Sequence, residues 1–294
     1  MISVRLMGGL GNQMFQYAIA RKLAITHHTS AYLDLVFYET DLDGVTPRRY
    51  ELSCFNIAAD ILPATRRPID ADNAYIGKRG KLLKIKHRLQ RKALNIYREP
   101  HHNFDSKVAK IPNDSYLIGY WQTEKYFSDI RQTLLQDFSV TSEAKGNNKK
   151  LLDEIRSNED SISIHVRRGD YVSNASASKF HGLKNQTYYH KALSVILKKC
   201  KNPILYVFSD DPTWCKNYLK FEQKTVYVEG NKDGFEDMRL MINCKHNIIA
   251  NSSFSWWAAW LNNNPDKIVV APAVWFNDPS IDTSDVVPVS WIKV

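Results

Sequence analysis

The second half of this 294-residue chain alternates strand-like and helix-like patterns, and this alternation limits the possible folds more than any other feature. Stretches with helical spacing of apolar residues, such as 188–199 and 236–244, separate short apolar runs typical of buried strands. The strand-like runs are residues 161–166, 204–208, 225–228, 247–250 and 267–271. Alternation of this kind predicts an α/β fold in which helices cover both faces of a parallel sheet.

The first half opens with a similar unit. Residues 2–6 read as a strand, a glycine-rich segment follows, and apolar residues recur at helical spacing from Met14 onward, so we expect Asn12 to cap the helix. Met14 stands where the dinucleotide-binding motif GxGxxG has its third glycine. The segment is therefore either a turn that presents backbone N–H groups to a ligand or a tight structural turn. Further strands are expected at 32–37 and 116–121.

A polar run at 142–148 is the best linker candidate. It predicts an N-terminal domain over residues 1–148 and a C-terminal domain over residues 149–294.

The formal net charge of +9 and the pI near 9.2 indicate an anionic partner: a nucleic acid, a nucleotide or a membrane surface. Residues 78–98 carry nine Lys or Arg and no Asp or Glu. We expect a basic amphipathic helix there, which either lies on anionic lipid or is a solvated face of its own domain. Nucleic-acid binding is a third option for this segment, which the sequence favours less because aromatic residues do not interleave with the basic residues as in a stacking platform; the partners we expect do not include a nucleic acid.

The four cysteines form no CxxC pair and have no histidine at zinc spacing, so we expect buried thiols in a reducing compartment. No signal peptide and no apolar run of about 18 residues is visible, and the expected location is cytoplasmic.

The most informative polar cluster lies at the carboxyl end of the 161–166 strand. His165, Arg167, Arg168 and Asp170 stand where ligands bind in open α/β sheets. Two adjacent guanidiniums can form a fork for a phosphate or pyrophosphate. Alternatively, the arginines form salt bridges with neighbouring carboxylates.

Four other positions allow a functional and a structural interpretation. Asp210 and Asp211 follow a strand and could bind a metal or ribose, or cap the helix that opens at Pro212. Ser252 and Ser253 precede a helix and could bind an anion or simply cap it. Asp237 could bind guanine through its carboxylate, or it could be an ordinary acidic residue in the first turn of a helix. The Asp41–Asp43 pair could hold a metal ion, or it could lie in a solvated turn.

Five motifs in this order resemble the bacterial α-1,2-fucosyltransferases. They are Gly8-Gly-Leu-Gly-Asn-Gln-Met-Phe-Gln-Tyr-Ala18, Gly119-Tyr-Trp-Gln122, His165-Val-Arg-Arg-Gly-Asp170, Phe208-Ser-Asp-Asp211 and Asn251-Ser-Ser-Phe-Ser-Trp-Trp257. The resemblance runs nearly end to end. It implies a GT-B-like fold, in which two Rossmann-like domains face a cleft, with the acceptor-side domain first and the GDP-fucose-binding domain second.

The resemblance also implies an activity and site residues. L-Fucose would pass from GDP-fucose, with inversion and without a metal, to the 2-hydroxyl of a terminal β-galactose in a surface glycan such as O-antigen. Arg167 would contact the β-phosphate, and Asn12 would lie near the acceptor. The other nucleotide-binding residues implied are His165, Arg168, Asp237, Ser252, Ser253 and Phe254.

The general base stays open at this stage: Asp170 is the first candidate, and it could instead orient Arg168. A lipid-linked acceptor would give the basic segment 78–98 a role in holding the enzyme peripherally at the inner face of the membrane. The alternatives are a GDP-sugar transferase of other linkage or acceptor and, from a different class, a basic nucleic-acid-binding protein.

Overall fold

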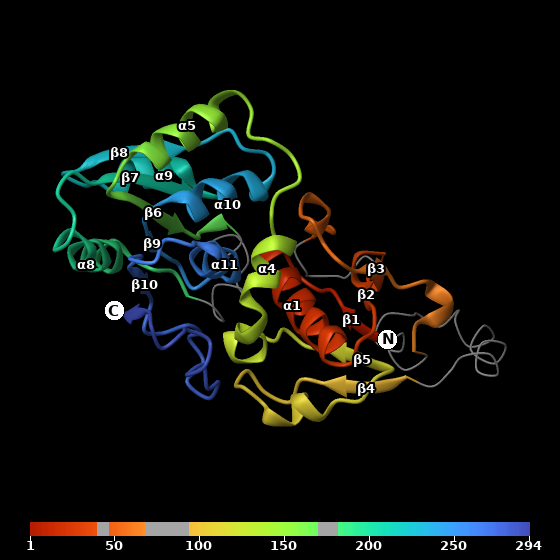
Figure 1. Cartoon of the computed structure of the whole chain (residues 1–294). Helices are drawn as coiled ribbons and strands as arrows, with labels where there is room; N and C mark the ends of the chain where they lie inside the picture. The colour runs from red at the N-terminus through yellow and green to blue at the C-terminus, as the bar shows by residue number, and fades with distance from the viewer. Residues whose placement is uncertain (40–46, 69–93, 170–181) are drawn as a thin grey trace. The chain divides into compact units, whose positions relative to one another are not determined.

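The computed structural model describes residues 1–39, 47–68, 94–169 and 182–294. The chain divides into two compact units, Met1–Ser139 and Val140–Val294. The polar run at 142–148 thus belongs to the second unit, and helix α5 (Gly146–Ser157) begins within it. Figure 1 traces both units along the chain.

The first unit contains a parallel sheet in the order β3-β2-β1-β5-β4. Its strands are β1 (Ile2–Arg5), β2 (Ala31–Asp34), β3 (Asp60–Ile61), β4 (Asn95–Arg98) and β5 (Ser115–Ile118). The register pairs Val4 with Leu33 on one side and with Leu117 on the other. The chain runs outward from β1 to β3 and then returns on the other side, so the strand order reverses between β1 and β5. The carboxyl ends of these two strands are where a ligand is expected.

Among the described residues of this unit, the α-helices are α1 (Leu10–Thr26) and α4 (Arg131–Asp137). All four residues of β1 are buried, as are most residues of α1. A buried ionic network lies at the carboxyl end of β2. Asp34 is fully buried, accepts a hydrogen bond from the Tyr116 hydroxyl and lies 2.9 Å from the Arg67 Nε atom.

The second unit contains a parallel sheet in the order β11-β10-β9-β6-β7-β8. Its strands are β6 (Ser161–Val166), β7 (Ile204–Ser209), β8 (Lys224–Val228), β9 (His246–Ile248), β10 (Val269–Ala271) and β11 (Ile292–Lys293). Counted from β6, this is the 3-2-1-4-5-6 order of dinucleotide-binding sheets, and the order reverses between β6 and β9.

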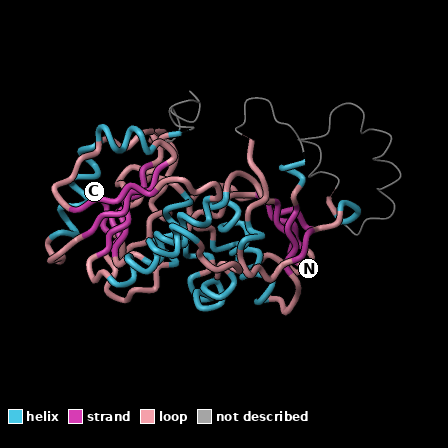
Figure 2. Tube along the Cα trace, turned by 90° about the horizontal axis from the view of Figure 1, so that it is seen from above, coloured by secondary structure: helices cyan, strands magenta, loops and turns pink. Residues whose placement is uncertain are grey.

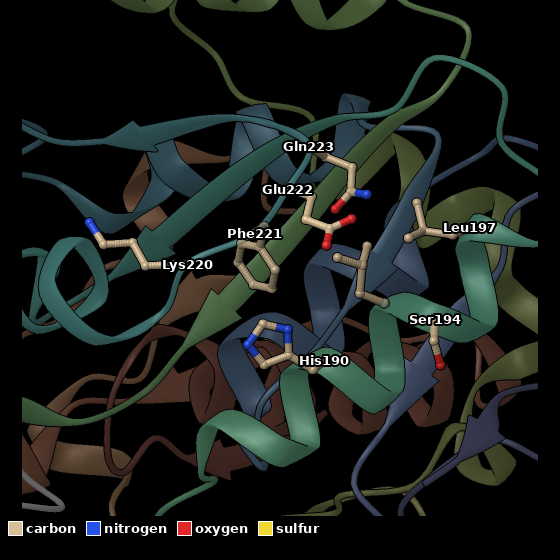
Figure 3. A pocket seen from close by; sticks show the side chains of 8 residues that line it. His190, Ser194, Leu197, Lys220, Phe221, Glu222 and Gln223 are labelled. Atoms are coloured by element: carbon tan, nitrogen blue, oxygen red, sulfur yellow. The ribbon is translucent and has the colours of Figure 1, made fainter.

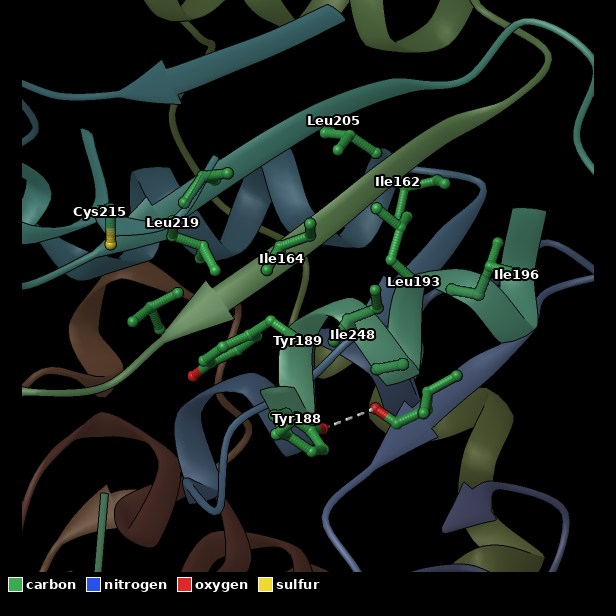
Figure 4. Close-up of a cluster of buried hydrophobic side chains, with 14 residues drawn as sticks. Ile162, Ile164, Tyr188, Tyr189, Leu193, Ile196, Leu205, Cys215, Leu219 and Ile248 are labelled. Carbon is green, nitrogen blue, oxygen red and sulfur yellow. Dashed lines mark hydrogen bonds between the residues drawn. The ribbon is translucent and has the colours of Figure 1, made fainter. Parts of the chain in front are cut away.

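Helices cover both faces of this second sheet. Beside α5 they are α8 (Gln186–Leu197), α9 (Pro212–Tyr218), α10 (Gly234–Asn243) and α11 (Ser253–Leu261). The core cluster in Figure 4 joins α8 and α9 to one face, and Ile162 and Ile164 of β6 point into it. Because side chains alternate along a strand, Ser163 and His165 point to the other face. There the Asn247 side chain donates to both the Ser163 hydroxyl and the Met241 carbonyl of α10. In Figure 2 the strands form a layer with helices beside them.

The predicted elements are largely confirmed: the 161–166 strand is found with the same bounds, and the other strands differ by a few residues at their ends. The predicted basic helix is wrong at its end, because residues 95–98 form β4, whose backbone hydrogen bonds pair with β5. Residues 78–93 lie outside the described residues. Among the helices that are described, none is long and apolar enough to span a bilayer.

Candidate active site

His165 is the most deeply buried candidate residue in the second unit. It lies near the end of β6, is 5 % exposed, and its ring centroid is 5.4 Å from that of Phe254. Burial lowers the pKa of His165 to about 4, with Arg167 acting in the same direction and Asp210 opposing it. The imidazole is therefore neutral at pH 7. Its buried Nδ1 atom has no hydrogen-bond partner within the described part of the chain, a costly state for a polar atom.

Arg167 and Arg168 bind different carboxylates and do not form one fork. Arg167 Nη1 lies 2.7 Å from Asp210 Oδ2. Arg168 Nε lies 3.1 Å from Asp211 Oδ2, and its guanidinium lies over the Trp214 ring at 4.0 Å. The salt-bridge alternative is thus what the structure contains. A phosphate bound at the carboxyl end of β6 would therefore contact Arg167 while Arg167 is paired with Asp210. Arg168 is held away by its contacts with Asp211 and Trp214 at α9.

The Asp210–Asp211 pair has a structural role in this arrangement. Asp211 caps α9: its Oδ1 accepts from the Trp214 backbone N–H at 3.0 Å, and Pro212 occupies the first helical position. Asp210 Oδ1 accepts from the Arg168 backbone N–H at 2.8 Å. A Cβ atom on Gly169 would lie 2.6 Å from Asp210 Oδ2, so glycine is required for this close approach. In the described part of the chain, no group of three or more potential metal ligands is found.

The start of α11 lies at the carboxyl end of β9, as predicted. Ser252 occupies the N-cap position but its side chain makes no capping hydrogen bond, and the helix begins at Ser253. This leaves the first N–H groups of the helix for another acceptor. A Cβ atom on Gly234 would lie 3.4 Å from the Phe254 ring, so the start of α10 packs on the same phenyl ring as His165.

Asp237 lies in the first turn of α10 and is half-buried. Its Oδ1 accepts from the Asn231 side chain at 2.6 Å, and Asn231 in turn accepts from Asn148 at 2.7 Å. Burial, with a smaller contribution from Glu236, raises the pKa of Asp237 to about 6, against the Asn231 hydrogen bond. Asn231 thus orients the carboxylate directly, and Asn148 does so through Asn231. Ionisation of the buried carboxyl is unfavourable unless further hydrogen-bond donors, such as those of a ligand, bind it.

Asn12 belongs to the first unit and does not cap α1 as predicted. Gly8, with φ +75°, and Gly9 let the helix start at Leu10, and Gly9 is the N-cap residue. The Asn12 Oδ1 atom instead accepts from the Gln122 side chain at 2.9 Å. Asp170 and the Asp41–Asp43 pair lie outside the described residues.

Three residues that the sequence patterns do not single out belong to these networks. Gln122 donates to Asn12, Trp214 lies under Arg168, and Glu99 accepts from the backbone N–H groups of Tyr120 and Trp121, next to Gln122. Gln122 stands in one of the quoted motifs and could have been noticed there. Glu99 and Trp214 act through contacts between segments distant in sequence, which no local pattern reveals.

One hollow of the second unit takes no part in this arrangement. This hollow, of about 430 Å³, lies between His190 on α8 and Phe221 in the segment before β8. Figure 3 shows the side chains that line it. No candidate residue lines it.

Comparison with known proteins places the chain in a family. The model of glycosyl transferase family 11 matches residues 1–294. An Escherichia coli alpha-1,2-colitosyltransferase is 34 % identical over 100 % of this chain and 98 % of its own. The Escherichia coli O-antigen biosynthesis glycosyltransferase WbnK is 36 % identical over 98 % of this chain and 99 % of its own.

Among solved structures, the NodZ alpha-1,6-fucosyltransferase soaked with GDP-fucose matches with a TM-score of 0.52 and 13 % identity, over 88 % of this chain and 92 % of its own. At that identity the likeness concerns the fold, and it confirms the expected GT-B class with two Rossmann-like units. The resemblance drawn from the five motifs is also confirmed: the chain belongs to glycosyl transferase family 11 and is a glycosyltransferase.

Proposed function

We propose that this enzyme transfers L-fucose from GDP-β-L-fucose to the 2-hydroxyl of a terminal β-galactose, with inversion and without a metal ion. The observation that carries the proposal is the surroundings of His165 in the second sheet. Three groups lie at the carboxyl ends of the two strands between which the order reverses: the neutral imidazole of His165, whose buried Nδ1 has no partner among the described residues, the Arg167 guanidinium, and the start of α11, where Ser252 makes no side-chain cap. These groups suit a nucleoside diphosphate.

Each part of GDP has a chemically matched group. The Asp237 carboxylate can accept from the N1–H and N2–H₂ groups of guanine, and Asn231 fixes its orientation. Arg167 and the N–H groups of Ser253 and Phe254 at the start of α11 can bind the diphosphate. His165 and the Phe254 ring, 5.4 Å apart, form the wall beside it. Arg168 contributes through its contacts with Asp211 and Trp214 by holding the segment after β6 in place.

The reaction develops negative charge on the leaving diphosphate as the fucose C1–O bond breaks. A fixed guanidinium and aligned backbone N–H groups stabilise such charge without reorganising, and loss of one donor of this kind costs about 10²–10³ in rate. These donors supply the charge stabilisation that a divalent ion gives in metal-dependent enzymes. The acceptor hydroxyl loses its proton as it attacks, and Asp170 is our first candidate for the base.

We further propose that the acceptor is a surface glycan, such as an O-antigen unit on a lipid carrier, used at the inner face of the membrane. The basic composition of residues 78–98 and the O-antigen relative support this. Electrostatic attraction of the basic residues to anionic lipid would hold the enzyme near such an acceptor.

A second donor is supported by one specific observation, the 34 % identity to a colitosyltransferase over the whole chain. Colitose is L-fucose without its 3-hydroxyl, so GDP-colitose would fit the same diphosphate and guanine contacts. The two donors differ only in the hydrogen bonds that the 3-hydroxyl makes.

A transfer assay tests the activity. Purified enzyme is incubated with lactose and either GDP-fucose or GDP-colitose in EDTA, and the product linkage is determined by NMR. We expect an α-1,2-linked product with a higher kcat/KM for GDP-fucose. A higher kcat/KM for GDP-colitose would transfer the proposal to that donor, and a product with another linkage would contradict it.

A further inference from the structure

A second hollow of the second unit lies at the edge of the sheet opposite the candidate active site. It has a volume of about 680 Å³, and its lining comes from the segments that precede β6, β7, β9 and β10. Since β6 has six residues, this amino edge is roughly 20 Å from the carboxyl ends of the strands. None of the described candidate residues lines the hollow, so it belongs to no site described above.

His246, the first residue of β9, lines this hollow and is only 8 % exposed. Its Nδ1 atom accepts from the Ile268 backbone N–H at 3.0 Å, so the ring proton of the neutral imidazole lies on Nε2. No described residue accepts a hydrogen bond from that Nε2–H group. A nearly buried donor in the wall of a hollow therefore awaits an acceptor.

Two lysines of the hollow have no structural partner. Lys199 follows α8 and Lys245 follows α10, and in the described part of the chain neither ammonium group forms a hydrogen bond or a salt bridge. Lys267 differs, because its ammonium donates to the carbonyls of Ala259 and Asn262 at the end of α11, both at 2.7 Å. Lys267 thus has a structural role, whereas Lys199 and Lys245 leave two cations available to a ligand.

The imidazole and the two free cations share one region. Burial is the main cause of the lowered pKa of His246, and among its charged neighbours Lys199 and Lys245 lower the pKa while Asp160 and Asp266 raise it. The ring is therefore neutral at pH 7, and it keeps one donor and one acceptor nitrogen.

Two exposed carboxylates, of Glu159 and Asp266, also line the hollow. Three lysines and two carboxylates leave the lining with a net charge of +1. Because the carboxylates are exposed, solvent and salt screen them, and they weaken the attraction of a small anion without cancelling it. A nucleic acid gains its affinity from many basic contacts and would also meet both carboxylates, so the lining suits a single anionic group better.

We propose that this hollow binds one phosphate group, with Lys199 and Lys245 supplying the charge and His246 Nε2 donating to a phosphate oxygen. The phosphate belongs either to a lipid headgroup or to a soluble phosphate ester, and the two arms of the experiment separate these sources. The site lies at the opposite edge of the sheet from the candidate nucleotide site and is independent of the proposed function.

Three single substitutions test the three groups. His246→Asn keeps an acceptor for the Ile268 N–H, has no counterpart of the Nε2 donor and leaves the net charge unchanged at pH 7. Lys199→Ala and Lys245→Ala each remove one cation. Lys191→Ala is the matched control, because Lys191 is an exposed cation of α8 that does not line the hollow. Circular dichroism melts check that each variant is folded.

The first arm uses glycerol 3-phosphate at constant ionic strength, with the histidine ring nitrogens followed by NMR. His246→Asn identifies the signals of His246. We expect its free ring to be the Nε2–H tautomer and its Nε2 signal to shift saturably with the phosphate ester but not with acetate. Loss of one charge-assisted hydrogen bond corresponds to about tenfold, so the Kd should rise about tenfold in Lys199→Ala and Lys245→Ala and less than twofold in Lys191→Ala.

The second arm measures sedimentation with vesicles of phosphatidylglycerol in phosphatidylcholine. Any lysine near an anionic membrane contributes to attraction, so the charge-neutral His246→Asn variant is decisive here. A lipid headgroup in the hollow predicts about tenfold weaker vesicle binding by His246→Asn than by wild type. Equal vesicle binding, together with a saturable response to glycerol 3-phosphate, would assign the site to a soluble ester.

The site is overturned if the His246 signals do not respond to glycerol 3-phosphate and wild type and His246→Asn bind vesicles equally. If His246→Asn does not fold, the double variant Lys199→Ala/Lys245→Ala takes its place in both arms. An affinity of this double variant equal to that of Lys191→Ala in both arms would likewise overturn the site.

Discussion

The Arg167 guanidinium is held by Asp210, which directly follows the neighbouring strand β7, with Nη1 of the arginine 2.7 Å from Oδ2 of the aspartate. The same aspartate accepts from the Arg168 backbone N–H through its other oxygen. One carboxylate therefore fixes both the side chain of Arg167 and the backbone that follows it. Asp210 positions the guanidinium before any ligand arrives, which reduces reorganisation during transfer.

Replacement of Asp210 should separate binding from catalysis. In Asp210→Asn the backbone contact can remain, but the guanidinium loses its charged anchor and the local negative charge falls by one. We expect GDP to bind at least as tightly as to wild type, while kcat falls about tenfold or more. Asp211→Asn is the matched control, since asparagine also caps helices well and should keep α9 intact.

Steady-state kinetics with GDP-fucose and lactose, together with GDP calorimetry, measure both quantities. An Asp210→Asn variant with wild-type kcat would show that this carboxylate has no positioning role.

The two arginines should differ in their tolerance of lysine. Arg167→Lys keeps the charge but loses the planar fork that can donate to Asp210 and a phosphate together, and we expect kcat to fall by about 10² or more. Arg168→Lys loses the stacking on Trp214 and should cost about tenfold or less, through the position of the segment after β6. Equal kcat values for the two variants would contradict the division of roles seen in the salt bridges.

Donor binding should depend on pH through Asp237. The pKa of this carboxyl is raised to about 6 in the free enzyme, and only the ionised form accepts two hydrogen bonds from guanine. Affinity should therefore fall about tenfold per pH unit below pH 6 and level off above pH 7. GDP-fucose is the appropriate probe, because its esterified diphosphate does not titrate in this range as GDP does.

Asp237→Asn serves as the control and should bind weakly at every pH, without this dependence. The raised pKa also affects stability. Between pH 3.8, the ordinary pKa of an aspartate, and about pH 6, the folded protein keeps the Asp237 proton while the unfolded chain loses it. The stabilising contribution of this residue to the free energy of unfolding is therefore lost as the pH rises through that window. A wild-type affinity for GDP-fucose that is unchanged from pH 5 to pH 8 would contradict the guanine role.

The ionic network of the first unit should matter for folding and not for binding. Asp34 is fully buried between Tyr116 and Arg67, so Asp34→Ala removes the buried carboxylate partner of a nearly buried guanidinium, which keeps its contact with Glu39. Breaking a buried pair costs about 3 kcal/mol or more in the free energy of unfolding. Asp129→Ala, which breaks an ion pair between Lys22 and a mostly exposed aspartate, should cost less than about 1 kcal/mol. Urea unfolding measures both, and equal losses would show that the buried network adds nothing.

Sequence reasoning was most successful where one strand carries its own signal. The 161–166 strand was predicted with its exact bounds because Ile162, Ile164 and Val166 alternate with polar residues and the apolar pattern then stops. The alternation of strands and helices, together with the end of that strand, also predicts that His165 lies at the carboxyl edge of a parallel sheet, where ligands bind. Such features depend on residues close together in the sequence.

Other features depend on contacts between distant segments and could not be read locally. The spacing of residues 78–98 predicts a basic helix that includes residues 95–98, yet pairing with β5 makes these four residues a strand. The partners of Arg167 and Arg168 come from the end of β7 and the start of α9, so the separation of the two guanidiniums was invisible in the sequence. Asn12 carries the side-chain type of a helix cap, but Gly8 and Gly9 let the helix start at Leu10, so the N-cap is Gly9, three residues before Asn12.

The most direct test of the account is calorimetric titration of the purified enzyme with GDP in the presence of EDTA, on wild type and Arg167→Ala, with Lys216→Ala as a control at an exposed cation of α9. We expect clear binding to wild type and to the control, undiminished by EDTA, and a loss of about 10² or more in affinity for Arg167→Ala. Binding that requires a divalent ion, or equal affinity of the Arg167→Ala variant, would contradict an arginine-based site for the diphosphate.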